Sequence, residues 1–178
     1  MLNRSSSGNG LIHKQKIGFL GPTGTYSYIA TKSIFESSTP TAPFQHIHPE
    51  HIEYVALPSI SDVFEKVESA ELNLGVVPVE NSIEGVVRDS VSSLISRSVC
   101  VLKEVELPIE HCLLSKESRV DDVKIIRAHP QALAQCKVWL ETHVPSAMLI
   151  PESSNSVAAL NLSAHEAVIG SRELSALY

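Results

Sequence analysis

Apolar and polar positions follow two different periods along this chain, and segments with the two periods alternate. Short apolar runs, which are typical of buried strands, occupy residues 16–20, 52–57, 72–79, 98–115, the start of 124–143, 147–154 and 167–171. Apolar residues three and four positions apart, which are typical of amphipathic helices, occur at residues 26–35, 59–72, 81–95, the rest of 124–143, 154–163 and 172–178. This alternation predicts an α/β fold with mainly parallel sheets.

The helix expected at 81–95 follows directly on the strand expected at 72–79. Asn81 and Glu84 have the spacing of a capping box, with Asn81 as the N-cap residue. Glu80 and its two successors would then lie at the carboxyl end of a strand. Ligands of α/β proteins bind at this edge of a sheet, so the polar stretch is a candidate ligand site.

Composition narrows the classes of function. The chain has 178 residues, of which 43% are hydrophobic, which is enough to form a core in one domain or in two small lobes. The net charge of -6, without any cluster of Lys and Arg, disfavours a nucleic-acid partner. No apolar run approaches the ~18 residues that span a membrane, so we expect a cytoplasmic protein.

The start of the chain and the cysteines refine that expectation. Residues 1–15 are rich in Ser, Gly and Asn and predict a disordered leader, with a transit peptide as the alternative. The cysteines are odd in number and widely spaced, which disfavours a disulfide framework and a zinc site. We expect reduced thiols that act as small core residues at Cys100, Cys112 and Cys136.

The histidines do not predict a metal site. His46, His48 and His51 are close together, but their proline-rich loop offers no further acidic or thiol ligand at a fixed spacing. His111 and His165 belong to no constellation that the sequence reveals.

Hydroxyl and carboxylate side chains mark two of the turns between a strand and a helix. In "GPTGTYS", the Thr23 and Thr25 hydroxyls and the backbone N–H groups at a helix start suit a carboxylate or a phosphate. In "ENSIEG", Glu80 could act as a base or hold a substrate hydroxyl, while Asn81 and Ser82 could hydrogen-bond a ligand. The alternative for both turns is ordinary helix capping, with Glu80 in solvent.

A third turn, in "RAHPQALAQC", carries a histidine at the start of a helix. The helix dipole there would favour a neutral His129 ring, although a structural hydrogen bond is the alternative role. Gln131 and Gln135 are four residues apart on one helical face and could hold a polar ligand or face solvent.

Taken in order, these motifs resemble a known family. The stretches "GFLGPTGTYS", "GVVPVENSIEGVV", "ELPIEHCLL", "AHPQALAQC" and "AVIGS" closely resemble the catalytic domain of prephenate dehydratase. The resemblance covers residues 16–178 and implies conversion of prephenate to phenylpyruvate in L-phenylalanine biosynthesis, without a cofactor or a metal. It implies a two-lobed fold similar to periplasmic binding proteins of the second type, with the active site in the cleft between the lobes. A homo-oligomer is left open.

The resemblance also implies lobe boundaries and site residues. The first lobe would comprise about 16–103 with 170–178, and the second about 104–169. Substrate binding is carried over to Thr23, Thr25, Asn81, Ser82, His129, Gln131 and Ala132. Glu80 joins this set on its own chemistry.

Two departures from the family pattern bear on activity. Ala128 stands where the family has Ser before the His-Pro pair, which removes one hydroxyl. The family places a Thr-Arg-Phe motif, whose Thr assists departure of the hydroxyl, further along the chain, followed by an ACT domain. In these 178 residues no Thr is immediately followed by Arg.

The catalytic group is therefore expected outside the given sequence. We expect a chain incomplete at its C-terminus, with the Thr of the Thr-Arg-Phe motif beyond Tyr178. The alternatives are a non-catalytic module of the same fold that binds a small carboxylate, and an inactive truncated fragment.

Overall fold

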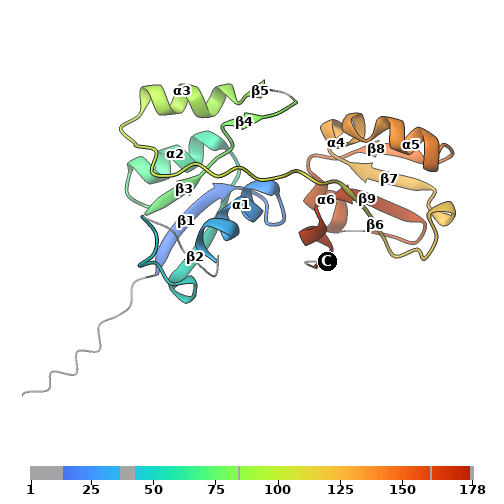
Figure 1. The fold of residues 1–178 in the computed structure, drawn as a ribbon, viewed down its shortest axis with the longest axis horizontal. Coiled ribbons are helices and arrows are strands. Elements are labelled where there is room, and N and C mark those ends of the chain that lie inside the picture. The colour runs from blue at the N-terminus through green and yellow to red at the C-terminus, as the bar shows by residue number, and fades with distance from the viewer. Residues whose placement is uncertain (1–13, 37–42, 84, 161, 177–178) are drawn as a thin grey trace, which may run out of the picture.

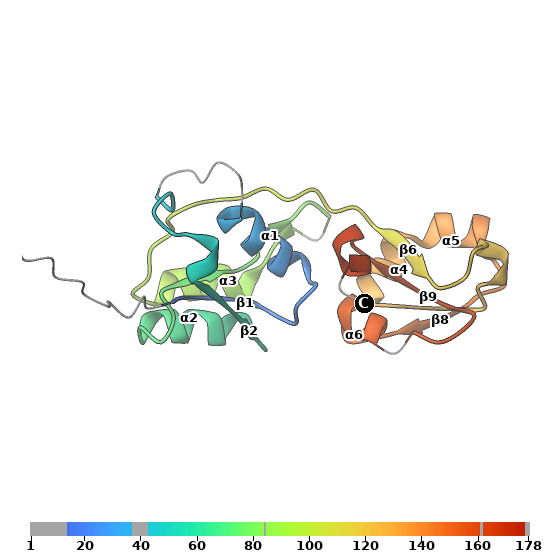
Figure 2. The ribbon, with the colours of Figure 1, turned by 90° about the horizontal axis from the view of Figure 1, so that it is seen from below.

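The computed structural model describes residues 14–36, 43–83, 85–160 and 162–176. The chain forms two lobes, each with its own sheet, joined by a long crossing segment (Figures 1 and 2). This is the two-lobed α/β arrangement with mainly parallel sheets that the sequence predicts. Most of the expected leader lies outside the described residues, and Gln15 already belongs to the first strand.

The first lobe is built on a parallel sheet with the strand order β2-β1-β3. Strand β1 (Gln15–Leu20) lies in the centre, and β2 (Ile52–Leu57) and β3 (Leu74–Val76) pair with it on either side. Ile17 and Phe19 of β1 are 0% and 1% exposed, because β1 is the inner strand and residues 26–35 cover this face of the sheet. The centre of the sheet is therefore also the centre of the first core.

Two helices cover opposite faces of this sheet. Phe35 of α1 (Tyr26–Phe35) packs with Ile17 in one buried cluster. Val63 of α2 (Ile60–Glu68) belongs to a second buried cluster on the other face. Both helices lie where the apolar periodicity predicts them, because their apolar stripes have a sheet face to cover.

The chain after β3 departs from the prediction of a long strand followed by a helix. Pairing with β1 ends at Val76, so the strand is shorter than the expected 72–79. Strands β4 (Glu80–Asn81) and β5 (Gly85–Val86) then form a small antiparallel hairpin, and α3 (Arg88–Ser96) begins only after it.

The predicted capping box is therefore wrong. Val87, and not Asn81, is the N-cap residue of α3. The side-chain oxygen of Asn81 instead accepts a hydrogen bond from the backbone N–H of Ile83 at 2.9 Å, which is an Asx turn. Glu84 lies outside the described residues. Gly85 has a φ of +79°, a conformation that favours glycine, and this suits the turn of the hairpin.

The crossing segment replaces most of the strand expected at 98–115. Residues 99–111 form neither helix nor strand, and they lead from the first lobe to the second (Figures 1 and 2). The expected strand is confined to β6 (Cys112–Ser115). Cys100 lies on the crossing segment and is exposed, so the prediction that it is a core residue is wrong.

The second lobe contains a sheet with the order β6-β9-β7-β8. Strands β7 (Ile125–Ala128), β8 (Met148–Pro151) and β9 (Glu166–Gly170) are parallel, and β6 is antiparallel to β9. Every residue of β9 is buried, as expected for an inner strand with both faces covered. The remaining short helices are α4 (Pro130–Gln135), α5 (Lys137–His143), α6 (Asn155–Leu160) and the 3-10 helices Pro49–His51, Val120–Asp122 and Arg172–Ala176.

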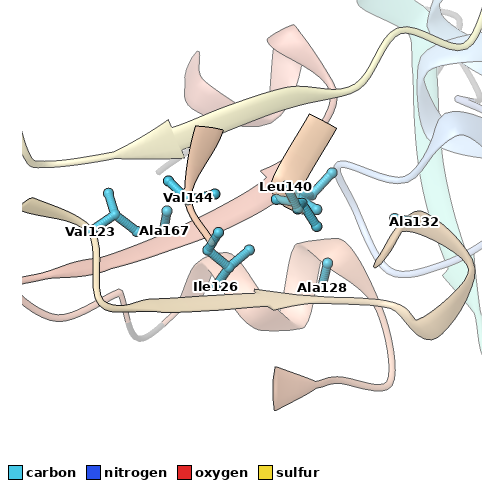
Figure 3. Close-up of a cluster of buried hydrophobic side chains, with 8 residues drawn as sticks. Val123, Ile126, Ala128, Ala132, Leu140, Val144 and Ala167 are labelled. Carbon is cyan, nitrogen blue, oxygen red and sulfur yellow. The ribbon is translucent and has the colours of Figure 1, made fainter. Parts of the chain in front are cut away.

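Apolar clusters lie on both faces of this second sheet. Figure 3 shows the cluster under α4 and α5, whose labelled residues are Val123, Ile126, Ala128, Ala132, Leu140, Val144 and Ala167. On the other face, Ala158 of α6 packs with Val168 and Leu174.

The end of the chain differs from the lobe boundaries that the resemblance implies. Residues 170–176 pack on the second lobe through Leu174, whereas the resemblance implies that 170–178 belong to the first. The described residues of this stretch do not follow the implied boundary, since Leu174 packs with Ala158 of α6 and Val168 of β9. Leu177 and Tyr178 lie outside the described residues, so the prediction for these two positions stays a prediction.

An ion-pair network crosses the strands of the second sheet. The Arg127 guanidinium lies 2.9 Å from a carboxylate oxygen of Glu152 and 3.0 Å from one of Glu166. The backbone N–H of Ser163 donates a third hydrogen bond to Glu166 at 3.1 Å. These contacts, those with Arg127 first, lower the pKa of the Glu166 carboxyl below its usual value.

This network predicts acid sensitivity of the second lobe. A carboxyl whose pKa is lowered in the folded state contributes stability that is present above its unfolded pKa of about 4.3 and is lost as the pH falls through the folded value. We expect the free energy of unfolding, measured by Trp139 fluorescence, to decrease as the pH is lowered from about 4.3. In Glu166→Gln this dependence on pH should be weaker. Glu141→Gln, a change of an exposed carboxyl on α5, is the control. An equal pH dependence in the wild type and Glu166→Gln would contradict the prediction.

Two kinds of feature are absent from the described part of the chain. Among residues 14–36, 43–83, 85–160 and 162–176, no helix is long and apolar enough to cross a membrane. Within the same ranges, no group of three or more His, Cys, Asp or Glu side chains is arranged to hold a metal ion.

Candidate functional site

The first polar turn connects β1 to α1. The Thr25 hydroxyl is the N-cap group of α1: it accepts from the backbone N–H of Tyr28 at 3.3 Å and donates to the carbonyl of Leu20 at 3.1 Å. Gly24 has a φ of +87°, which favours glycine. Thr25 is thus engaged in the turn itself, whereas Thr23 is exposed.

The second polar turn is the tip of the β4–β5 hairpin. Glu80 and Ser82 are exposed, and Asn81 between them is half-buried by its Asx turn. At the base of the hairpin, the buried Ser90 of α3 donates its hydroxyl to the carbonyl of Pro78 at 2.6 Å. The hairpin is therefore anchored at its base and carries its polar side chains at an exposed end.

The third polar turn connects β7 to α4. His129 is the N-cap residue of α4, and its Nδ1 accepts from the backbone N–H of Gln131 at 3.3 Å. Its own backbone N–H donates to the side-chain oxygen of Asn155 at 2.8 Å. Because Nδ1 accepts, the neutral ring carries its proton on Nε2 and can donate from there. Ala132 is 1% exposed and packs in the second core, so it can offer a ligand only its backbone.

Two of these turns belong to one lobe and the third to the other. In both views the first turn and the hairpin lie at the end of the first lobe that faces the second (Figures 1 and 2). Helices α4 and α6 lie at the end of the second lobe that faces the first. The fold thus places the polar turns of both lobes on facing ends.

A set of side chains that the sequence does not predict joins the two lobes. The Tyr26 hydroxyl donates to the carbonyl of Glu110 at 2.9 Å and lies 3.3 Å from Nδ1 of His111. Nε2 of His111 lies 2.7 Å from the side-chain oxygen of Gln135 on α4. The pattern of histidines assigns His111 to no constellation; the motif "ELPIEHCLL" and the position of Gln135 on the helix are the available signals, but neither shows which partners meet.

A cavity of about 230 Å³ adjoins this set of side chains. Its lining combines apolar groups with two thiols: His111, Cys112, Leu113, Cys136, Trp139, Leu140 and Ile169. Burial raises the pKa of the Cys136 thiol, so it stays protonated near neutral pH. Burial, together with the nearby Cys112 and Glu173, raises the pKa of Tyr26 to about 12, which keeps its hydroxyl protonated as well.

A family model described as prephenate dehydratase matches residues 17–178 of the chain. The chain belongs to the prephenate dehydratase family. The resemblance found in the ordered motifs is thereby confirmed, since the match covers nearly the whole sequence after the leader.

Curated relatives support the family assignment. A bifunctional chorismate mutase/prephenate dehydratase of Pseudomonas aeruginosa is 37% identical over 145 residues, which cover 81% of this chain and 36% of that protein. The chain therefore spans about a third of the length of this relative.

Solved structures confirm the fold. A prephenate dehydratase of Staphylococcus aureus superposes with a TM-score of 0.74 at 22% identity, over 92% of this chain and 57% of that one. A prephenate dehydratase of Arthrobacter aurescens in complex with L-Phe superposes with a TM-score of 0.64 at 24% identity, over 92% of this chain and 52% of that one. The chain thus has the two-lobed fold that is similar to periplasmic binding proteins of the second type. The facing polar turns belong to this fold.

Proposed function

We propose that this chain carries the prephenate-binding site of a prephenate dehydratase, which converts prephenate to phenylpyruvate in L-phenylalanine biosynthesis. The observation that carries the proposal is the placement of polar turns from both lobes on facing ends of a chain of this family. Prephenate has a carboxylate on its ring, a second carboxylate on its side chain and a ring hydroxyl. Polar groups on two facing ends suit a ligand with polar groups on opposite sides.

The reaction requires positioning more than chemical activation. The bond between the ring and its carboxylate breaks, CO₂ leaves, and the electron pair enters the ring. The bond between the ring and the hydroxyl breaks, its electron pair leaves with the oxygen, and a proton completes a water molecule. The ring becomes aromatic, so the protein has to hold both carboxylates and donate a hydrogen bond or proton to the departing hydroxyl.

The residues of the turns divide this work by their local geometry. Thr23, Ser82 and the Nε2 of His129 are donors at exposed positions and suit the carboxylates. Asn81 and Gln131 add amide groups beside them, and the family resemblance assigns both to substrate binding. The turns that carry Asn81 and His129 are fixed by hydrogen bonds to the backbone.

The remaining members of the set act differently. Thr25 shapes the first turn, because its hydroxyl already bonds Leu20 and Tyr28. Ala132 contributes its backbone, since its side chain is buried. Glu80 is exposed and is proposed to accept a hydrogen bond from the ring hydroxyl of the substrate.

The group that assists departure of the hydroxyl stays a prediction. No Thr-Arg-Phe motif occurs in the 178 residues, so the Thr that the family uses for this step is proposed to lie beyond Tyr178. A chain extended through such a motif should form phenylpyruvate faster than the 178-residue chain, with similar affinity for prephenate. Equal turnover by the two chains would show that the residues up to Tyr178 supply the proton donor themselves.

The test measures binding and turnover separately. The purified chain is titrated with prephenate by calorimetry, and phenylpyruvate formation is followed in the same preparation. Succinate, a dicarboxylate without the ring, is the control ligand. Binding of prephenate is the expected result, with slow turnover by the 178-residue chain and faster turnover by the extended one. Binding without turnover by both chains supports the alternative of a non-catalytic carboxylate-binding module. Absence of binding by a chain that unfolds cooperatively on heating would reject the proposal, and absence of cooperative unfolding would identify an inactive fragment.

Further predictions belong to the same proposal. We assign about 16–103 to the first lobe and about 104–169 to the second, with the described residues 170–176 packed on the second. A cytoplasmic location and assembly as a homo-oligomer stay predictions. Size-exclusion chromatography with light scattering measures the second of these directly.

A further inference from the structure

A chain of hydrogen bonds runs from α1 of the first lobe to α4 of the second. It begins at the Tyr26 hydroxyl, which lies 2.9 Å from the carbonyl of Glu110 and 3.3 Å from Nδ1 of His111. It continues from Nε2 of His111 to the side-chain oxygen of Gln135 at 2.7 Å. Tyr26 and His111 are 85 residues apart in the sequence, so the contact depends on the placement of the lobes.

The chemistry of these groups fixes the directions of the hydrogen bonds. The side-chain oxygen of Gln135 only accepts, so Nε2 of His111 carries a proton and donates it. The Tyr26 hydroxyl donates to the Glu110 carbonyl. In a charged ring Nδ1 donates to the Tyr26 oxygen. In a neutral ring with its proton on Nε2, Nδ1 only accepts, so the single Tyr26 proton goes either to the Glu110 carbonyl or to Nδ1. Tyr26 therefore keeps a hydrogen bond to residues 110–111 in both protonation states of His111.

The surroundings of Tyr26 show that its ring reaches the second lobe. Its ring centroid is 6.1 Å from that of His111, in an edge contact of 64°. Burial and the proximity of Cys112, Glu173 and Cys136 raise its pKa to about 12. Those three residues belong to β6, the last 3-10 helix and the junction of α4 with α5, all in the second lobe.

The ends of this link lie directly beside the residues proposed to bind the ligand. Tyr26 follows Thr25 in the first turn, and Gln135 lies about one helical turn after Gln131 on α4. A hydrogen bond between the two ends therefore constrains how the first turn and the third turn face each other. Neither Tyr26 nor His111 is among the residues that the family resemblance assigns to substrate binding.

We propose that Tyr26, His111 and Gln135 are positioning residues that hold the two lobes in the arrangement in which their polar turns bind one ligand. The identity of the ligand rests on the proposed function, whereas the link between the lobes does not. The three side chains act as one unit, because Tyr26 makes the contact between the lobes and Gln135 fixes the orientation of the His111 ring that Tyr26 contacts.

The first measurement is of lobe tumbling by ¹⁵N NMR relaxation, which needs no ligand. In the wild type both lobes share one rotational correlation time. Tyr26→Phe and Gln135→Met each shorten the correlation times of the lobes toward those of separately moving bodies. Tyr28→Phe removes a hydroxyl from the same helix but changes a ring that packs on Phe19 and Tyr54 inside the first lobe, so it retains the common value.

A rescue variant separates the hydrogen bond from packing. Gln135→Glu keeps an oxygen acceptor for His111 Nε2, so it retains the common correlation time, whereas Gln135→Met does not. The thermal unfolding of each lobe stays unchanged in all variants, because the ring and the helix packing are kept. Separate tumbling in the wild type, equal effects of Tyr26→Phe and Tyr28→Phe, or a Gln135→Glu protein that behaves as Gln135→Met would each overturn the proposal.

The second measurement is of prephenate affinity. Loss of one hydrogen bond of the link weakens binding by about fivefold, and the effects of Tyr26→Phe and Gln135→Met do not multiply in the double variant, because either change already breaks the link. Changed tumbling in a protein whose wild type does not bind prephenate rejects the proposed function and keeps the link. Normal prephenate binding with unchanged tumbling in both variants keeps the function and rejects the link.

Discussion

Phe19→Ala is expected to lower the free energy of unfolding of the first lobe by about 3–5 kcal/mol, which is the usual cost of removing a buried phenylalanine ring. Phe19 is 1% exposed in the central strand β1, and its ring lies 5.3 Å from that of Tyr28. Both neighbouring strands flank it, at Ala56 and Val76, so the surrounding structure has little freedom to close the cavity.

The measurement uses the single tryptophan of the chain. Trp139 lies on α5 in the second lobe, stacked on His143, so its fluorescence reports that lobe, whereas circular dichroism reports both. In Phe19→Ala, the transition seen by circular dichroism moves to lower urea while the Trp139 transition stays. Ile126→Ala is the matched control, because Ile126 is 0% exposed in the core of the second lobe. It should lower the free energy of unfolding measured by Trp139 fluorescence by about 2–5 kcal/mol. A common shift of both signals in Phe19→Ala would show that the lobes unfold as one unit.

His129→Asp is expected to weaken prephenate binding strongly without unfolding α4. An aspartate oxygen can accept from the backbone N–H of Gln131 as Nδ1 of His129 does, so the helix keeps its cap. The substitution removes the Nε2 donor and places a negative charge beside a carboxylate of the ligand, which it repels. A hydrogen bond to a charged group contributes about 1.5–3 kcal/mol, so affinity should fall by a factor of at least ~10 and up to ~100.

His129→Asn is the matched variant for that experiment. Its side-chain oxygen keeps the cap, and its NH₂ group can still donate to a ligand, so we expect a much smaller loss of affinity than in His129→Asp. Calorimetric titration with prephenate and thermal unfolding of both variants separate binding from folding. Wild-type affinity in His129→Asp would show that His129 serves only as the helix cap.

The sequence predicts those strands and helices whose apolar residues all pack against one neighbouring surface. Strand β2 and helix α1 have the predicted bounds, because a pattern of period 2 or 3.6 next to a turn leaves few alternatives. Ser59 caps α2, with its hydroxyl 3.1 Å from the backbone N of Asp62. In these segments local preference and long-range packing agree.

The hairpin at residues 80–86 could not be predicted, because Asn81 fits two local structures equally well. The same side-chain oxygen can cap a helix or close an Asx turn, and the apolar Val86 and Val87 suit a helical stripe as well as the end of a hairpin. The crossing segment poses a related difficulty. Its valines and leucines have strand propensity, but residues 99–111 have no sheet neighbour to pair with, and pairing is a property of the whole fold.

Part of the candidate site could also be predicted from the sequence. The position of the three turns follows from the order of strands and helices, so Thr23, Ser82 and His129 can be found as candidates. The contact of Tyr26 with His111 cannot, since it joins two residues 85 positions apart through the relative placement of two lobes. No local sequence pattern indicates that these two residues are in contact.

The separation of the two sheets along the sequence has a consequence for biosynthesis. In the described part of the chain, all strands of the first sheet lie before residue 77 and all strands of the second lie after residue 111. A ribosome therefore synthesises β1, β2 and β3 before any strand of the second sheet, and domains generally fold as units in that order. The exposed crossing segment is synthesised between the two sheets, so β1, β2 and β3 can pair before the strands of the second lobe emerge.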